Sequence, residues 1–252
     1  MNSTGNTILV TGSTSGIGLG LALRLHSAGN TVIIAGRRQA LLDKIVSEHP
    51  GMESILLDVA DPLSIQRSSE ALAASHPDLN VLINNAGIMQ WEDLTDPESL
   101  SIAENLVTTN LLGTLRMVYA FLPQLLKQPS ATIMNVSSGL GFVPLPATAT
   151  YSATKAAVHS FTQSLRVQLA DSPIEVIELA PPGVRTDLLR MENNDHAMPL
   201  DEFLNEIFEL LGSTPTPQEL IVERAKPFRF AEANGSHGEL LKMLAAVKPP
   251  AV

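Results

Sequence analysis

Short runs of apolar, often β-branched residues alternate with longer amphipathic stretches through the first two-thirds of the chain. The apolar runs span 7–10, 31–35, 54–57, 81–83, 132–136 and 175–179, and helical patterns lie between them at 16–26, 39–48, 62–75, 97–126 and 151–170. Continuously apolar runs predict strands buried on both faces, as in a parallel sheet covered by helices. The sequence therefore predicts an α/β fold with a doubly wound parallel sheet in three αβα layers and right-handed crossovers.

The remaining third of the chain has a different pattern. Helical periods span 200–211 and 238–247, but no strong strand run follows Leu179. No linker or repeat divides the 252 residues, so we expect a single domain over 1–252, with residues 188–252 forming a substrate lid and an irregular helical C-terminal cap. The apolar lid residues weakly favour a hydrophobic substrate, although a packed helix needs the same face; they are Met191, Met198, Phe203 and Phe208. Pro123 is expected to bend or end the long helix over 97–126.

Charge and composition exclude several classes of function. The net charge of −10 leaves no basic cluster for nucleic acid. The absence of cysteine excludes disulfide frameworks, thiolate nucleophiles and Cys-ligated metals. The six histidines lack metal-ligand spacing, so no metal site is expected. No segment matches a secretory signal or a spanning helix, and we expect a cytoplasmic protein without a membrane partner.

A glycine-rich turn follows the first predicted strand. The sequence Thr11-Gly12-Ser13-Thr14-Ser15-Gly16-Ile17-Gly18 has the spacing G-x-x-x-G-x-G and opens the first predicted helix. Gly12 permits a tight turn, Gly16 lets the backbone approach a pyrophosphate, and Gly18 lets the helix pack closely on the strand. The helix N-terminus adds N–H groups and a positive dipole end. The turn predicts a dinucleotide site of the Rossmann type, lined by Ser13, Thr14 and Ser15.

The end of the second predicted strand favours NADP(H) over NAD(H). An acidic residue there would accept hydrogen bonds from a ribose 2′-hydroxyl, whereas this chain has Arg37 and Arg38. Two guanidinium groups suit a 2′-phosphate, although two solvated arginines opening a helix would look the same. Asp58 ends the third run, where it could accept from the adenine amino group or cap the next helix.

A hydroxyl, a phenol and an amine form the candidate catalytic group. Ser137 and Ser138 end the fifth run, Tyr151 follows, and Lys155 lies one helical turn beyond Tyr151. An ammonium close to the phenol should lower the tyrosine pKa toward neutral pH, where acid/base catalysis is most effective. Ser138 could hold the substrate oxygen. His159, one turn after Lys155, could reach the cofactor, but an ordinary helix histidine is the more common case.

These motifs resemble those of the short-chain dehydrogenase/reductases over about residues 6–190. Within that family, the overall sequence is most similar to the DltE-type oxidoreductases. The matching elements are the glycine turn, Asn84-Asn85-Ala86-Gly87, Asn110, Ser138 and Tyr151-x-x-x-Lys155. The resemblance implies that Tyr151 is the catalytic acid/base, Ser138 polarises the substrate, and Lys155 lowers the tyrosine pKa and binds ribose. It implies that Asn110 holds a water that relays protons to Lys155.

The resemblance also implies the remaining cofactor contacts. Asp58 and Val59 would touch adenine, Asn85, Ala86 and Gly87 would line the adenosine side, and Thr186 would bond the nicotinamide carboxamide, in a loop with Pro181 and Val184. The chain departs from the family in two places. Pro181-Pro182 stands where the family usually has Pro-Gly, although Pro182-Gly183 would also match with a spacing to Thr186 shorter by one residue, and the final strand is not visible. Since that strand commonly forms a tetramer interface, a homodimer through the 97–126 and 151–170 helices is expected.

Two functions therefore follow from the sequence. The first is an NADP(H)-dependent oxidoreductase that transfers hydride between nicotinamide and a small-molecule carbonyl or secondary alcohol. The alternative is a non-catalytic NADP-binding, redox-responsive regulatory protein, which the intact Ser138, Tyr151 and Lys155 argue against.

Overall fold

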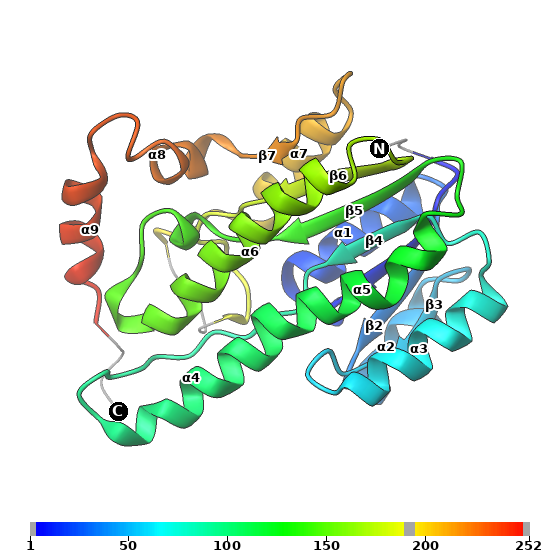
Figure 1. Cartoon of the computed structure of the whole chain (residues 1–252), viewed down its shortest axis with the longest axis horizontal. Coiled ribbons are helices and arrows are strands. Elements are labelled where there is room, and N and C mark those ends of the chain that lie inside the picture. The colour runs from blue at the N-terminus through cyan, green and yellow to red at the C-terminus, as the bar shows by residue number, and fades with distance from the viewer. Residues whose placement is uncertain (1–3, 189–194, 249–252) are drawn as a thin grey trace.

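Seven parallel strands form one sheet in the order β3-β2-β1-β4-β5-β6-β7, in a computed structural model that describes residues 4–188 and 195–248 (Figure 1). The strands are β1 (Thr7–Thr11), β2 (Thr31–Gly36), β3 (Glu53–Leu56), β4 (Val81–Asn84), β5 (Ala131–Val136), β6 (Ile174–Leu179) and β7 (Glu219–Leu220). Strand order reverses beside β1, which pairs with β2 on one side and β4 on the other. Ligands of open α/β sheets bind at the carboxyl edge at such a switch point.

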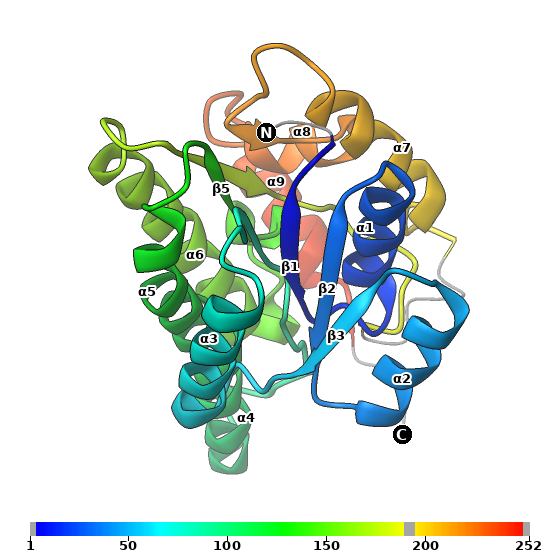
Figure 2. The same ribbon diagram turned by 90° about the vertical axis from the view of Figure 1, so that its right-hand side faces the viewer.

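Helices cover both faces of the sheet (Figure 2). One face carries α1 (Gly16–Ser27), α2 (Gln39–Glu48) and α7 (Leu200–Leu211), and the other carries α3 (Pro62–Ser75), α4 (Leu100–Leu106), α5 (Gly113–Leu125) and α6 (Ala149–Gln168). Two buried apolar clusters fill the layers, one on each face of the sheet. The short α8 (Lys226–Arg229) and α9 (His237–Ala245) complete the C-terminal region. The predicted doubly wound α/β fold is confirmed.

The long helical stretch over 97–126 is continuous but not uniform. It begins with a 3-10 turn at Pro97–Ser99, continues as α4, and passes through a π-helical segment at Val107–Leu112 before α5. Pro123 lies in the last turn of α5, so it marks the end of the helix rather than a bend within it. π-helical turns inside α-helices often occur at functional sites.

Two expectations about the C-terminal third are wrong. A strand does follow Leu179: β7 pairs in parallel with Glu178 and Leu179, and its two residues are too few to give an apolar run. The helix over 200–211 is observed as predicted, but Phe203 is fully buried on α1, so its apolar face belongs to the core. Met198 is buried in the same cluster, and Met191 lies outside the described residues. The apolar character of Met198 and Phe203 therefore follows from core packing and says nothing about the substrate.

No helix in the described ranges has both the length and the apolar character needed to cross a bilayer.

Candidate functional site

The glycine turn is tightly packed against the end of β4. Gly12 and Gly16 have positive φ values of 64° and 56°, which favour glycine. A Cβ atom on Gly12 would lie 2.6 Å from the Cα atom of Ala86, and one on Gly18 would lie 2.5 Å from the Gly12 carbonyl oxygen. The helix α1 begins at Gly16, and the Ser15 side chain makes no capping hydrogen bond. The first N–H groups of α1 are therefore suited to bind an anion such as a pyrophosphate.

The three hydroxyl residues of the turn differ in orientation. The Ser13 hydroxyl is buried, donates to the Val10 carbonyl oxygen at 2.7 Å and accepts from the Ala35 amide at 2.9 Å. This hydroxyl therefore joins β1 to β2, so a contact of Ser13 with a phosphate would have to come from its backbone. Thr14 accepts a hydrogen bond of 2.7 Å from the Arg38 guanidinium, which also reaches Ser15 at 3.4 Å. Arg38 thus lies directly over the glycine turn.

A cavity of about 330 Å³ opens at the carboxyl edge beside Arg37. Its walls come from the end of β2, the segment after β4, α4 and the segment after β6; the lining residues are Arg37, Gly87, Ile88, Met89, Gln90, Asn105, Asp187 and Leu188. Arg37 is exposed at its rim. The cavity and the free N-terminus of α1 together fit an extended, phosphate-bearing dinucleotide.

Asp58 lies after β3 and is engaged within its own loop. Its carboxylate accepts from the Ala60 amide at 2.9 Å, and its amide donates to the Ser64 hydroxyl at 3.0 Å. The residue that caps α3 is Asp61, which accepts from the Leu63 amide. The alternative interpretation of Asp58 as the helix cap is therefore wrong. Its neighbour Val59 packs where a Cβ atom on Gly113 would lie, at 3.0 Å.

The Asn85-Ala86-Gly87 segment holds the glycine turn in place. The Asn85 side-chain amide donates to the carbonyl oxygens of Thr11 at 3.0 Å and Gly12 at 3.1 Å. The backbone amides of Asn85 and Ala86 both donate to the Thr11 hydroxyl. A Cβ atom on Gly87 would lie 3.3 Å from Asn110 Oδ1 and 3.7 Å from Lys155 Nζ. The segment therefore joins the nucleotide end of the site to the candidate catalytic end.

Asn110 lies in the π-helical segment and is fully buried. Its side chain accepts from the Ile88 amide at 2.8 Å and donates to the Ile88 carbonyl oxygen at 2.8 Å. It also reaches the Thr154 hydroxyl at 3.4 Å. In this structure, Asn110 ties the segment after β4 to the helices, a contact that the sequence did not indicate.

Tyr151, Lys155 and Ser138 gather at the carboxyl end of β5. Tyr151 is 6% exposed and Lys155 is 5% exposed, both on the first turns of α6. The Lys155 ammonium donates to the Val136 carbonyl oxygen at 2.7 Å and lies 5.7 Å from the centre of the Tyr151 ring. The backbone around Ser138 is fixed by bonds from Gly139 to Pro181 and from Leu140 to the Ser138 hydroxyl. The predicted hydroxyl, phenol and amine therefore lie together.

The pKa values in this group run against the expectation. Burial raises the pKa of Tyr151 to about 12, and a hydrogen bond with Ser138 lowers it by less. The expected lowering of the tyrosine pKa by Lys155 is therefore wrong for this structure, because desolvation of the phenolate outweighs it. Burial also lowers the pKa of Lys155 to about 8, opposed by the charge of Glu178. The phenol is held neutral at physiological pH.

The loop after β6 returns to the glycine turn. The Thr186 side chain lies 3.3 Å from where a Cβ atom on Gly16 would be. Val184 forms an isolated bridge with Met198, and the Pro181 carbonyl oxygen accepts from the Gly139 amide at 2.8 Å. The loop therefore spans from the Ser138 region to the N-terminus of α1.

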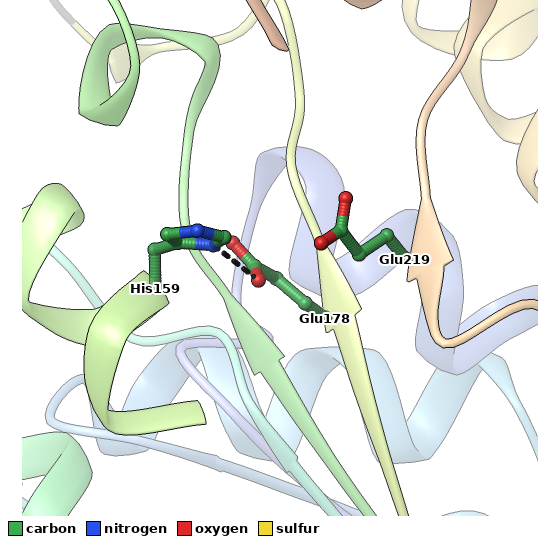
Figure 3. Close-up of side chains that lie close together, drawn as sticks. All are labelled: His159, Glu178 and Glu219. Carbon is green, nitrogen blue, oxygen red and sulfur yellow. Dashed lines mark hydrogen bonds and ion pairs between the residues drawn. The ribbon is translucent and has the colours of Figure 1, made fainter. Parts of the chain in front are cut away.

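A cluster that the sequence analysis missed lies directly behind the catalytic group. His159, Glu178 and Glu219 come from α6, β6 and β7 and have side-chain donor and acceptor atoms within 4.8 Å of one another (Figure 3). His159 is thus bonded to Glu178, at 2.7 Å, rather than being an isolated helix histidine. The sequence did contain a signal for this cluster: the carboxylate Glu178 lies among the apolar residues of the strand run 175–179.

Known proteins that are similar to this chain show its family. The family model for short chain dehydrogenases matches residues 6–197. The chain belongs to this family. It is 39% identical over 235 residues to the uncharacterized oxidoreductase DltE of Bacillus subtilis, across 92% of this chain and 93% of that protein. An uncharacterized oxidoreductase of Staphylococcus aureus is 32% identical over 195 residues, across 77% of this chain and 84% of that protein.

Solved structures of this short chain dehydrogenase family have the same architecture. A short chain dehydrogenase from Burkholderia cenocepacia in complex with NADP is 25% identical, covers 98% of this chain and 100% of its own, and has a TM-score of 0.82. A serine dehydrogenase complexed with NADP+ is 26% identical, over 84% and 92% of the two chains, with a TM-score of 0.76. This short chain dehydrogenase is a NAD(P)-dependent oxidoreductase, and its glycine turn and cavity fit a nicotinamide dinucleotide.

Proposed function

We propose that this chain reduces a small-molecule carbonyl, or oxidises the matching secondary alcohol, with NADP(H) as cofactor and Tyr151 as general acid/base. The observation that carries the proposal is the gathering of Tyr151, Ser138 and Lys155 at one strand end, beside Gly87 and within reach of the glycine turn. The intact group does not favour the alternative of a non-catalytic regulator. When bound, the nicotinamide supplies or accepts the hydride.

Each side chain has a role that follows from its chemistry. A neutral phenol is the form required of a proton donor, and burial keeps Tyr151 in that form. In the reducing direction, Tyr151 donates its proton to the substrate oxygen, while the Ser138 hydroxyl donates a hydrogen bond to the same oxygen. In the oxidising direction, Tyr151 must first lose its own proton, and the phenolate then takes the proton from the alcohol.

Lys155 stabilises the phenolate that forms when Tyr151 loses its proton. Its ammonium lies 5.7 Å from the centre of the Tyr151 ring. An ammonium this close to the ring attracts the negative charge of a phenolate and so lowers the cost of forming it during the reaction. We propose that Lys155 also binds the nicotinamide ribose and that Asn110 holds a proton-relaying water.

The cofactor contacts extend from the glycine turn toward both ends of the cavity. Arg37 and Arg38 would bind the 2′-phosphate and so favour NADP(H) over NAD(H). The support is the position of Arg37 at the cavity rim and of Arg38 over Thr14 and Ser15. Asp58 and Val59 would contact the adenine, and Thr186, in the loop with Pro181 and Val184, would contact the carboxamide.

We further propose a homodimer formed through the outer surface of α5 and α6, in a cytoplasmic protein. Tyr119 on α5 is 73% exposed and Val167 on α6 is 77% exposed, and Leu112 and Leu126 are also exposed. A run of large exposed apolar side chains on neighbouring helices is typical of an interface.

The test uses the only two tyrosines in the chain. Oxidation of NADPH by the purified wild-type chain is measured with a panel of ketones and aldehydes. Tyr151→Phe should lower kcat by at least about 100-fold, the scale of general acid catalysis, with NADPH binding by fluorescence nearly unchanged. Tyr119→Phe is the matched control and should retain wild-type kcat. A Tyr151→Phe variant that keeps more than a few percent of the rate would refute the role.

A further inference from the structure

Glu178 is a fully buried carboxylate near one edge of the sheet. It lies in β6, paired in register with Asn135 of β5 on one side and Glu219 of β7 on the other. Burying a charged carboxylate away from water costs much free energy unless hydrogen-bond donors and opposite charges surround it. The groups that surround Glu178 therefore indicate its role.

Both oxygens of Glu178 are hydrogen-bonded. Oε1 accepts from the Ser137 hydroxyl at 2.5 Å, and Oε2 lies 2.7 Å from His159 Nδ1 (Figure 3). Because an ionised carboxylate only accepts, Nδ1 of His159 carries the proton in this arrangement. The edge of the imidazole packs on Phe142, with ring centres 4.8 Å apart. Two donors from α6 and the end of β5 thus hold the carboxylate in place.

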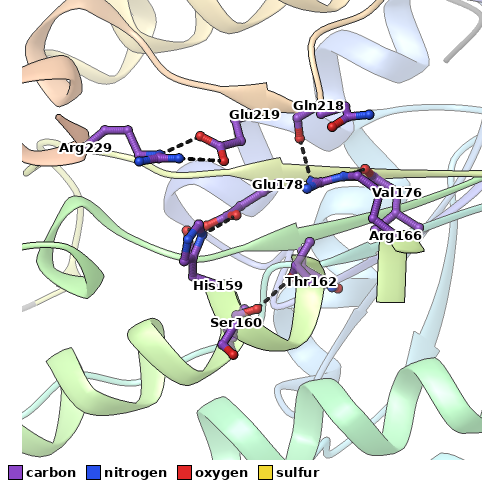
Figure 4. A network of polar contacts seen from close by, with 12 residues as sticks. His159, Ser160, Thr162, Arg166, Val176, Glu178, Gln218, Glu219 and Arg229 are labelled. Atoms are coloured by element: carbon purple, nitrogen blue, oxygen red, sulfur yellow. Dashed lines mark hydrogen bonds and ion pairs between the residues drawn. The ribbon is translucent and has the colours of Figure 1, made fainter. Parts of the chain in front are cut away.

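The neighbouring Glu219 is neutralised separately. Arg229 binds it through two hydrogen bonds, of 2.6 and 3.0 Å, and also lies over the Phe142 ring (Figure 4). The four carboxylate oxygens of Glu178 and Glu219 therefore all have donors from within the chain. The cluster is therefore a hydrogen-bonded network in this structure.

Lys155 is a buried cation on the same face of α6 as His159. Lys155 lies one helical turn before His159, and its ammonium binds the carbonyl oxygen of Val136, the residue that precedes Ser137. The ends of β5 and β6 are paired in register from Asn135 with Glu178 to Val136 with Leu179. Glu178 thus binds Ser137, the neighbour of Ser138, and His159, which lies one helical turn after Lys155.

We propose that Glu178 is a positioning residue: it keeps the Lys155 ammonium charged and, through Ser137, fixes the strand end that carries Ser138. The part of this that concerns catalysis rests on the proposed function. The charge of Glu178 opposes the effect of burial on the pKa of Lys155. The other ionisable groups around the pair are Tyr151 and His159 on α6, Glu219 on β7 and Arg229 on α8.

Glu178→Gln removes the charge with the hydrogen bonds retained. The amide oxygen can accept from Ser137, and the amide nitrogen can donate to Nδ1 of the other His159 tautomer. Carbon NMR of chain labelled at the lysine ε-carbon, with Lys155→Arg for assignment among the six lysines, gives the pKa of Lys155 directly. The expected shift is about one pKa unit downward, as for the loss of a nearby opposite charge. Glu219→Gln, which breaks a pair that Arg229 already balances, should shift it much less. An unchanged Lys155 pKa in Glu178→Gln overturns the proposal, as does an equal shift in both variants.

The pH profile separates positioning from a merely structural role. In NADPH-dependent turnover, a plot of kcat/KM against pH should have an inflection at the pKa of Lys155. In Glu178→Gln this inflection should move by the amount that NMR gives, whereas in Glu178→Asp, which keeps the charge, it should stay at the wild-type pH even where kcat falls. Inflections that move by the same amount in the two variants contradict the proposal.

A wild-type measurement covers the case in which Glu178→Gln does not fold. The side-chain carboxyl carbon of Glu178, labelled and assigned with Glu178→Asp, should show an inflection at the pH where Lys155 titrates. A signal that stays flat through that range overturns the proposal. Since both NMR titrations need no turnover, a chain that reduces no carbonyl yet shows the coupling refutes only the proposed function.

Discussion

Gly18 and Gly20 lie two residues apart in α1 and meet different neighbours, so their alanine variants test the packing of the glycine turn. A Cβ atom on Gly18 would lie 2.5 Å from the Gly12 carbonyl oxygen and 2.3 Å from the Asn85 amide nitrogen. That amide is already bound to the Thr11 and Gly12 carbonyl oxygens. A Cβ atom on Gly20 would meet only the Leu204 side chain, with Cδ1 at 2.4 Å, which can rotate.

The expected free-energy changes follow from these contacts. Overpacking against backbone costs about 1–3 kcal/mol, and weakening the two Asn85 hydrogen bonds costs about 1 kcal/mol each. Replacing a helical glycine by alanine returns about 1 kcal/mol. Gly18→Ala should therefore lower the free energy of unfolding by about 3 kcal/mol, whereas Gly20→Ala should change it by less than about 1 kcal/mol.

Thermal unfolding and NADPH fluorescence measure the two consequences. For a chain of this size, about 3 kcal/mol corresponds to a Tm lower by about 6–12 °C. Gly18→Ala should also weaken NADPH binding by about tenfold or more, because the displaced Gly12 backbone lies where the pyrophosphate would bind, a loss of about 1.4 kcal/mol. Gly20→Ala should bind NADPH as the wild type does. Equal Tm values and equal NADPH affinities in the two variants would refute the packing argument.

Three other predictions follow from the same structure. Replacing both Arg37 and Arg38 by Ala should raise the KM for NADPH with little effect on the KM for NADH. An equal rise in KM for the two cofactors would show that these arginines do not select NADPH. Tyr119→Lys should convert a dimer of twice 26.9 kDa into a monomer by light scattering, whereas Met243→Lys, at another exposed apolar position, should not, and a wild-type monomer would contradict the interface. Because burial lowers the pKa of Lys155 from 10.5 to about 8, the unfolded chain binds more protons between these values, so the free energy of unfolding should rise across pH 8 to 10.5 by about 3 kcal/mol relative to Lys155→Met. A constant difference between the two chains over that range would show that the lysine pKa is not depressed.

The sequence predicted the sheet well because most of its strands are buried on both faces, although β3 at the sheet edge is partly exposed. Six of the seven strands and the helices between them lie within two residues of the apolar runs and helical periods. β7 escaped prediction because two residues give no period, and its position depends on pairing with β6. The α7 helix was placed correctly, but only its packing on α1 shows that its apolar face belongs to the core.

The sequence predicted which residues form the candidate site, but not the direction of the Tyr151 pKa shift. Spacing along one helix brought Tyr151 and Lys155 together, and the end of β5 supplied Ser138. The pKa values depend on burial, which the spacing of residues does not give, so the direction for Tyr151 was wrong. The Glu178 network joins α6, β5, β6, β7 and α8, and such long-range juxtapositions exist only once the sheet has formed. The bond of Asn110 to Ile88 is long-range in the same sense.

The most direct test of the account is a crystal structure of the chain with NADP+ bound. We expect the nicotinamide ring to face Tyr151 and Ser138, with Lys155 within hydrogen-bond distance of the adjoining ribose. We expect the 2′-phosphate to contact Arg37 and Arg38. A nicotinamide ring placed away from Tyr151, or a dinucleotide bound away from the N-terminus of α1, would contradict the account.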